Sequence, residues 1–161
     1  RGNEMSDKQK LTKVLEVALA ASAADGVEYD EAMSLANSIL PAIVTGESVE
    51  EFLTTEAGID IEDVDFSELI DVIPEIIEIV KSAEAIELDS NYMQEASSII
   101  GDGIVINNLC MALSIRIAGA DGISAMEAGA LEIVAQGLVN INPDIIDGIL
   151  HGLTVAEEAM S

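Results

Sequence analysis

The sequence predicts an all-α protein, a compact single-domain bundle of about seven to eight helices spanning residues 1–161, on three observations. Apolar residues recur at intervals of three and four along most of the chain, which is the period of an amphipathic helix. Capping residues and Asp-Gly breaks separate these segments. No two segments show the paired alternation that a sheet requires.

The first predicted helix hairpin covers residues 8–43. Its first helix is expected over Lys8–Ala24, where apolar side chains form one stripe. Asp25-Gly26 ends this helix, because glycine readily adopts the left-handed conformation of a helix C-cap. The second helix is expected over Glu28–Ile43. Pro41 either kinks or ends it, because proline lacks a backbone N–H group.

The region 45–100 is expected to connect the first hairpin to a second one. Ser48 and Glu51 form a capping box, so a short helix should run to about Glu56. Residues 59–66 alternate acidic and apolar side chains. We interpret them as a loop, because no second strand pattern exists with which they could pair.

An isoleucine-rich segment and a further helix complete the connecting region. Ser67, or the acids before it, is expected to cap the segment that runs to Val80. Pro74 within this segment either starts a new helix or kinks an existing one. Ser90 is expected to cap a helix that ends at Ile100, where a Gly-Asp-Gly sequence follows.

The second predicted hairpin covers residues 104–139. A long amphipathic helix is expected over Ile104–Ala120, and Asp121-Gly122 ends it. Ser124 and Glu127 form a capping box for the second helix of this hairpin.

The C-terminal region 142–160 is expected to hold two helices. Asn142-Pro143 opens the first, and Thr154 with Glu157 opens the second. Residues 1–4, before Met5, do not resemble a natural N-terminus, and we expect them to derive from an expression vector.

Two turns of the same sequence mark an internal repeat. Asp25-Gly26 and Asp121-Gly122 lie 96 residues apart, and the flanking positions match at the same offset. The matched pairs include Val14 with Cys110, Leu15 with Met111, Val17 with Leu113, Leu19 with Ile115, Glu31 with Glu127 and Leu35 with Leu131. We therefore predict that residues 11–40 superpose on residues 107–136 as one kind of hairpin, related by a pseudo-twofold axis.

The most similar parts of the two copies are the blocks Ala24–Ala32 and Ala120–Ala128, which share Ala-Asp-Gly, an aliphatic residue and, after three residues, Glu-Ala. On these blocks, the chain resembles the tellurite-resistance TerB-like family. The resemblance implies a non-enzymatic helical domain that binds metal through acids near the turns. It also implies that the protein acts with other stress-response proteins at or near the inner membrane. On the matching positions the ligand candidates are Asp25, Glu31, Asp121 and Glu127.

A fifth candidate ligand, Glu28, belongs to the first copy alone, because Ser124 stands at the equivalent position of the second copy. Carboxylate oxygens are the ligands that Ca²⁺ or Mg²⁺ prefers. The alternative role is structural: an aspartate at the end of a helix can accept hydrogen bonds from the backbone N–H groups that open the next helix. An EF-hand is excluded by spacing, because Ala32 would occupy the position of its bidentate glutamate.

Charge restricts the partners of this chain. Thirty-one acidic residues against six basic ones give a net charge of −25, which repels nucleic acid and anionic lipid. Cations and basic protein surfaces are attracted, although the acidity can also serve only solubility or adaptation to salt. No apolar run is long enough to cross a membrane, so we expect a cytoplasmic protein that reaches membranes only through partners. Formation of a homodimer is left open.

The inventory of catalytic groups is poor. His151 is the only histidine, and we interpret it as a helix-end residue. Cys110 is the only cysteine, and its apolar neighbours predict a core position. No phosphate-binding or dinucleotide-binding motif occurs. We therefore expect no catalytic residues and no organic cofactor.

Two functions follow from the sequence. The first is a TerB-like protein of metal or oxyanion stress that coordinates a divalent cation through its Asp-Gly turns. The alternative is an acidic interaction module that binds no metal and docks a basic protein partner.

Salt should stabilise this protein, even a monovalent salt, because like charges crowd a surface on which the Debye length is about 8 Å at physiological ionic strength. Lys8, Lys10 and Lys13, with Arg1, are four of the six bases, so the first helix should lie against acidic neighbours. The melting temperature is expected to rise from low salt to molar NaCl. A constant melting temperature would mean that repulsion between the surface charges is unimportant.

Overall fold

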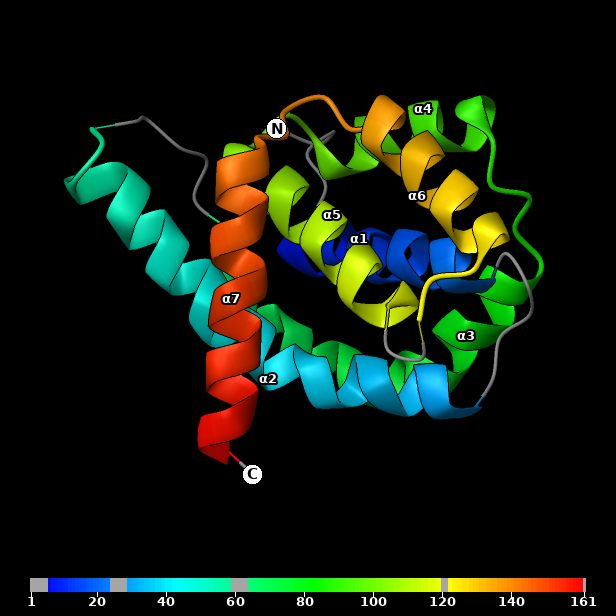
Figure 1. The fold of residues 1–161 in the computed structure, drawn as a ribbon, viewed down its shortest axis with the longest axis horizontal. Helices are drawn as coiled ribbons and strands as arrows, with labels where there is room; N and C mark the ends of the chain where they lie inside the picture. Colours follow the sequence, from blue (N-terminus) through cyan, green and yellow to red (C-terminus); the bar gives the residue numbers. More distant parts are fainter. Residues whose placement is uncertain (1–5, 24–28, 59–63, 120–121, 161) are drawn as a thin grey trace.

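The computed structural model describes residues 6–23, 29–58, 64–119 and 122–160, with the backbone alone for residues 29–34 and 160. Throughout this part the regular structure is helical, and no strand occurs in it. Figure 1 shows the arrangement of the helices. In chain order they are α1 (Asp7–Ser22), α2 (Tyr29–Thr55), the 3-10 helix η2 (Phe66–Glu75), α3 (Ile76–Glu84), α4 (Ser90–Ile100), α5 (Ile104–Ala118), α6 (Ala125–Gly137) and α7 (Pro143–Met160). The predicted all-α fold is confirmed.

The core forms around α1 and α5, which make the largest helix-to-helix contact of the described chain. Helix α1 begins with a capping box, in which the backbone N–H of Gln9 donates to Ser6 Oγ and that of Ser6 donates to Gln9 Oε1. Helix α5 buries 12 of its 15 residues, so it is an interior helix with almost no solvent-facing side. The sequence predicted an amphipathic α5 and thus understated its burial.

The two hairpins follow the predicted offset of 96 residues. Helices α1 and α5 end at Ser22 and Ala118, and α2 and α6 begin at Tyr29 and Ala125, so both boundaries are shifted by 96 positions. In addition, α1 contacts α2 and α6, while α5 contacts the same two helices. These four helices therefore keep the predicted spacing, and the superposition of the two hairpins stays a prediction. The Asp-Gly aspartates of both turns lie outside the described residues.

One contact joins two matched positions of the repeat. Cys110 Sγ lies 4.0 Å from the backbone oxygen of Val14, 96 residues earlier in the chain. Residues close to a twofold axis meet their own counterparts across it, as in a symmetric dimer. The predicted pseudo-twofold axis would pass between α1 and α5 near these residues.

Helix α2 is longer than predicted. It does not end near Ile43, because it runs through Pro41 to Thr55, and no new helix starts at Ser48. The Ser48 hydroxyl instead donates to the backbone oxygen of Val44, 2.9 Å away, as in a helix interior. The proline leaves the carbonyl of Asn37 without its helical partner, and Asn37 is exposed to water that can satisfy it.

The segment after residue 63 contains a cap that was only partly predicted. Asp65 caps η2, since its Oδ1 accepts the backbone N–H of Ser67 at 3.1 Å. An acid before Ser67 was one of the two predicted caps. Pro74 lies at the end of η2, two residues before α3 begins at Ile76, so it marks a change from 3-10 to α-helix. Of the predicted loop, residues 59–63 lie outside the described residues.

The cap of α4 is shifted by one residue from its prediction. Asp89, and not Ser90, is the N-cap, because its Oδ1 accepts the backbone N–H of Tyr92 at 2.8 Å. Helix α4 then runs over Ser90–Ile100, so its predicted end is confirmed.

Helix α7 is a single helix where two were predicted. Thr154 does not start a helix; its hydroxyl donates to the backbone oxygen of Leu150, 3.1 Å away. His151 consequently lies in the middle of α7 and is exposed, and the prediction that it ends a helix is wrong. The continuous helix crosses α2 (Figure 1), and Gly152 packs against Thr45 at this contact.

Described basic side chains lie against acids, as predicted for the first helix. Lys8 Nζ lies 2.8 Å from Glu75 Oε2, and Lys13 Nζ lies 2.7 Å from Glu16 Oε1. A hydrogen bond and the charge of Glu75 raise the pKa of Lys8. The Tyr92 hydroxyl also donates to Glu16 at 2.8 Å, which ties α4 to α1. Arg116 of α5 pairs with Glu157 of α7.

Among the helices in the described part of the chain, none combines the length and the apolar character needed to cross a membrane. This finding agrees with the sequence prediction that the chain has no membrane-spanning segment.

Replacing Gly152 by alanine should destabilise the protein by about 1 to 3 kcal/mol, because the added Cβ would lie 2.8 Å from Thr45 Cγ2. Thr45 is buried and β-branched, so its side chain cannot easily move away. Gly148→Ala on the same helix is the control. Its Cβ meets nothing within 4 Å, so a better helix former should stabilise by about 0.5 to 1 kcal/mol. Urea unfolding measures both. Equal effects of the two substitutions would contradict a tight α2–α7 crossing.

Candidate functional site

The predicted metal ligands lie almost entirely outside the described side chains. Asp25, Glu28 and Asp121 belong to stretches that the structure does not describe, and Glu31 lies on α2 with only its backbone described. Glu127 is therefore the one predicted ligand whose side chain can be placed. The ligand set stays a prediction.

Glu127 has a structural task. It is only 4% exposed, and its Oε1 accepts the backbone N–H of Ser124 at 3.0 Å. In return, the backbone N–H of Glu127 donates to Ser124 Oγ at 3.1 Å. This reciprocal pair is the predicted capping box of α6, and it is confirmed. One carboxylate oxygen of Glu127 is thus engaged in capping.

Elsewhere in the described chain, no three side chains of histidine, cysteine, aspartate or glutamate lie together in a way that could hold a metal ion. Hard cations prefer six or more oxygen ligands.

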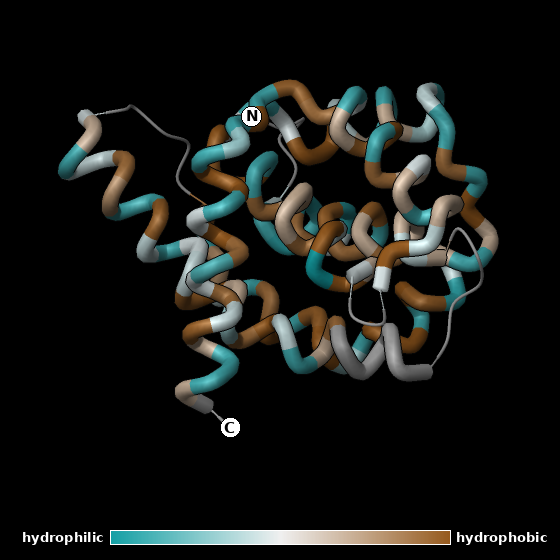
Figure 2. Tube along the Cα trace, viewed as in Figure 1, coloured by the Kyte–Doolittle hydropathy of each residue, from teal (hydrophilic) through white to brown (hydrophobic). Residues whose placement is uncertain are grey.

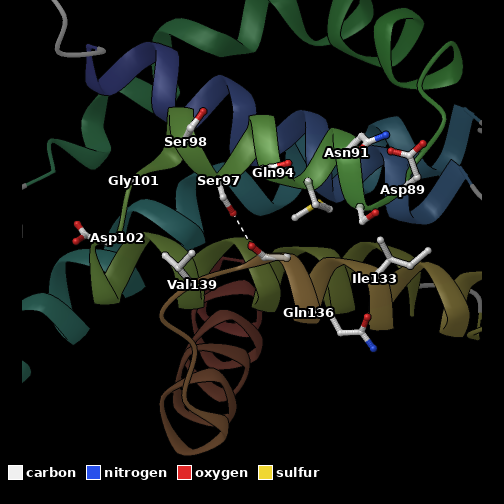
Figure 3. Close-up of a pocket in the computed structure, with 13 residues that line it drawn as sticks. Asp89, Asn91, Gln94, Ser97, Ser98, Gly101, Asp102, Ile133, Gln136 and Val139 are labelled. Atoms are coloured by element: carbon white, nitrogen blue, oxygen red, sulfur yellow. Dashed lines mark hydrogen bonds between the residues drawn. The ribbon is translucent and has the colours of Figure 1, made fainter.

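A groove between α4 and α6 has a volume of about 970 Å³ (Figure 3). The sequence did not predict it. We refer to it as the α4–α6 groove, and its lining residues are Asp89, Ser90, Asn91, Met93, Gln94, Ser97, Ser98, Gly101, Asp102, Ile133, Gln136, Gly137 and Val139.

A close approach of the two helices sets the shape of the groove. At Gly137 an added Cβ would lie 2.5 Å from Met93 Cβ, so α4 and α6 touch where α6 has no side chain. The Ser97 hydroxyl donates to the backbone oxygen of Gly137 at 2.6 Å (Figure 3). These two contacts join α4 to the end of α6, and the groove lies around them.

The end of the groove near Asp102 is held by asparagines. Gly101, at φ 86°, lets the chain turn out of α4, a conformation that a side chain would disfavour. Asn107 Nδ2 donates to the backbone oxygen of Gly101, and Asn140 Nδ2 donates to that of Asp102, both at 3.0 Å. The buried Asn108 binds the backbone of Asn140 in turn. These side-chain hydrogen bonds therefore hold the backbone of the loop that carries Asp102.

The side chains of the groove can bind but offer little to catalysis. Its lining contains amides, hydroxyls, three apolar side chains and the carboxylates of Asp89 and Asp102, but no histidine, cysteine, lysine, arginine or tyrosine. The Ser97 hydroxyl donates to a backbone oxygen, so no base activates it. Asp89 and Asp102 lie at opposite ends of the groove (Figure 3), and the eleven residues of α4 between them keep the two carboxylates too far apart to act as a catalytic pair.

The single thiol is equally unsuited to chemistry. Cys110 is fully buried in α5, and burial raises the pKa of its thiol to about 12, against a smaller opposing effect of Ser114. The predicted core position of Cys110 is confirmed.

Comparison of this chain with protein families, with curated proteins and with solved structures finds no match. The resemblance to the TerB-like family therefore rests on the two sequence blocks Ala24–Ala32 and Ala120–Ala128.

Cys110 should not react with an aromatic disulfide reagent at pH 8 in the folded protein, and should react fully in denaturant. Folding raises the thiol pKa from 9.0 to about 12, so the folded state keeps the proton that the unfolded state loses. This contribution to stability is complete below pH 9 and declines as the pH rises toward 12. Absorbance of the released thiolate follows the reaction. Rapid labelling of folded protein would contradict the burial of Cys110.

Proposed function

We propose that this protein is a non-catalytic binding module that holds a short, extended, basic segment of a partner protein in the α4–α6 groove. The observation that carries the proposal is the arrangement of the groove: an uncharged hydrogen-bonding surface with a carboxylate at each end (Figure 3). This is the acidic interaction module that the sequence suggests as its alternative function, now with a binding surface.

The two carboxylates define the length of the segment. Asp89 caps the start of α4 and Asp102 follows its end, so the eleven residues of α4 separate them by about 17 Å along the helix axis at 1.5 Å per residue. An extended peptide of about six residues covers the same distance. A lysine or arginine near each end of such a segment can reach one aspartate.

The middle of the groove fits the rest of the segment. Asn91, Gln94 and Gln136 have amide groups that both donate and accept, so they can pair with the N–H and C=O groups of an extended backbone. Ile133 and Val139 add apolar contact for aliphatic side chains. The absence of basic side chains from the lining, together with a net charge of −25, disfavours anionic ligands and draws basic ones.

Fluorescence anisotropy with a labelled peptide of sequence Arg-Ser-Leu-Ser-Leu-Ser-Arg tests this function. Asp89→Asn with Asp102→Asn should weaken binding about five- to thirtyfold, from about 0.5 to 1 kcal/mol for each exposed charge pair. Asparagine at position 89 keeps the helix cap.

The control for this experiment is Glu84→Gln with Asp147→Asn, which removes the same charge from exposed positions outside the groove. It should leave the affinity within about twofold of wild type at physiological salt, where distant charges are screened. If both double variants weaken binding equally, the peptide follows the overall charge and the groove is not its site.

A second proposal is that divalent cations bind at the two Asp-Gly turns. One observation favours it: the helices on either side of both turns end and begin at equivalent positions, so the two turns span the same length. Asp25 and Glu31 of the first turn correspond to Asp121 and Glu127 of the second. A role in metal or oxyanion stress, as the TerB-like resemblance implies, would follow from such binding.

Calorimetric titration with Ca²⁺ tests the cation site. Each turn offers two or three carboxylates against the six to eight oxygens that Ca²⁺ prefers, so we expect a dissociation constant of roughly 10⁻⁴ to 10⁻³ M. Asp25→Asn with Asp121→Asn should fold normally, because asparagine is also a good capping residue, and should lose the binding. Equal binding by wild type and variant would assign cation uptake to the diffuse acidic surface.

A further inference from the structure

The outer face of α2 carries an apolar stripe that the described chain leaves uncovered. Leu40, Val44 and Phe52 are 47%, 55% and 58% exposed. At 3.6 residues per turn these three positions fall within an arc of about 120°, which also contains the exposed polar residues Ser48 and Glu51 and, near its edge, the buried Pro41. Buried Ile39 and Leu53 lie on the opposite side of the helix, against the core. Helix α2 is thus held to the core by one face, and the stripe lies on its other face.

Phe52 is the most unusual residue of this stripe. The chain has two phenylalanines and no tryptophan, and the other phenylalanine, Phe66, is fully buried against Gly46. An exposed aromatic side chain in so aromatic-poor a protein does nothing for the core. Aromatic side chains are the residues on which protein interfaces most often depend.

The charges around the stripe are all negative. Glu51 is exposed and lies in the same arc as Leu40 and Val44, the exposed Glu47 borders this arc, and the sequence of α2 contains no lysine or arginine. This half of α2 projects from the body of the protein (Figure 1), and hydrophobic and hydrophilic residues alternate along it (Figure 2). Its outer face therefore combines apolar contact with acidic charge.

We propose that the outer face of α2 docks a basic amphipathic helix of a partner protein. Charge distinguishes among the partners that could bind this face. A second copy of this chain would be repelled, because each copy has a net charge of −25. An anionic bilayer would be repelled for the same reason. A helix with an aliphatic face and flanking lysine or arginine meets both the apolar stripe and the glutamates.

The dimensions of the stripe suit this occupant. From Leu40 to Phe52 the helix rises about 18 Å, or three to four turns, which is the length over which two helices pack side by side. An arginine of the partner can also lie over the Phe52 ring, an attraction between cation and aromatic face. This surface shares no residue with the α4–α6 groove, so it stands apart from the function proposed above.

The test uses the full chain and a labelled peptide in which leucine recurs at intervals of three and four and lysine fills the other positions. Val44→Ala with Phe52→Ala should weaken its binding about tenfold in anisotropy measurements. Ile77→Ala with Met126→Ala is the matched control, because these side chains are 68% and 61% exposed elsewhere on the surface. The control pair should bind as wild type does.

Amide shifts in the NMR spectrum locate the peptide independently of affinity. Shifts confined to residues 40–55 support the proposal, with thermal melting used to show that each variant is folded. Three results would overturn it: no binding by wild type, equal binding by wild type and the α2 variant, or equal loss in both variant pairs. Binding of the Arg-Ser-Leu peptide is measured beside it, so failure of this proposal is distinguished from failure of the groove.

Discussion

The contact between α1 and α5 holds the rest of the structure in place. At Val14 and Cys110 the two helices meet with a thiol against a backbone oxygen, and α2 and α6 each pack on both helices. Neither hairpin therefore has a core of its own, since each completes its core with the central helix of the other. Apolar burial at this contact must also oppose the mutual repulsion of a surface with a net charge of −25.

The sequence predicted those helix boundaries that depend on a local backbone device. The capping box of Ser124 and Glu127 and the break at Gly101 are where they were expected. Ser48 and Thr154 were predicted by the same kind of signal, and both lie inside longer helices with their hydroxyls bonded to the preceding turn. A serine or threonine hydroxyl can serve either purpose, and packing decides between them. Here Gly152 of α7 packs on α2 beside these segments, a contact between distant parts of the chain.

The groove could not be predicted because no sequence motif describes it. Its walls come from α4 and α6, and its shape depends on the absence of a side chain at Gly137, which the sequence presents only as one more glycine near a helix end. The buried Asn107 and Asn108 hold the loop that ends the groove, and no motif around them indicates that role. The predicted metal ligands, by contrast, come from a repeated motif, and most of them lie outside the described side chains.

The two copies of the hairpin differ most in where their second helices stop. Helix α6 ends at Gly137, and the equivalent position in the first copy is Pro41, beyond which α2 continues to Thr55. A pseudo-twofold pair of hairpins has the geometry of a homodimer whose subunits have been joined into one chain. Once the two copies are joined in one chain, their sequences can differ. Both copies must keep the shared core, but only one needs to carry an additional helical segment. The extension of α2 is thus an asymmetry that a true homodimer could not hold, since a symmetric dimer would present such a segment twice.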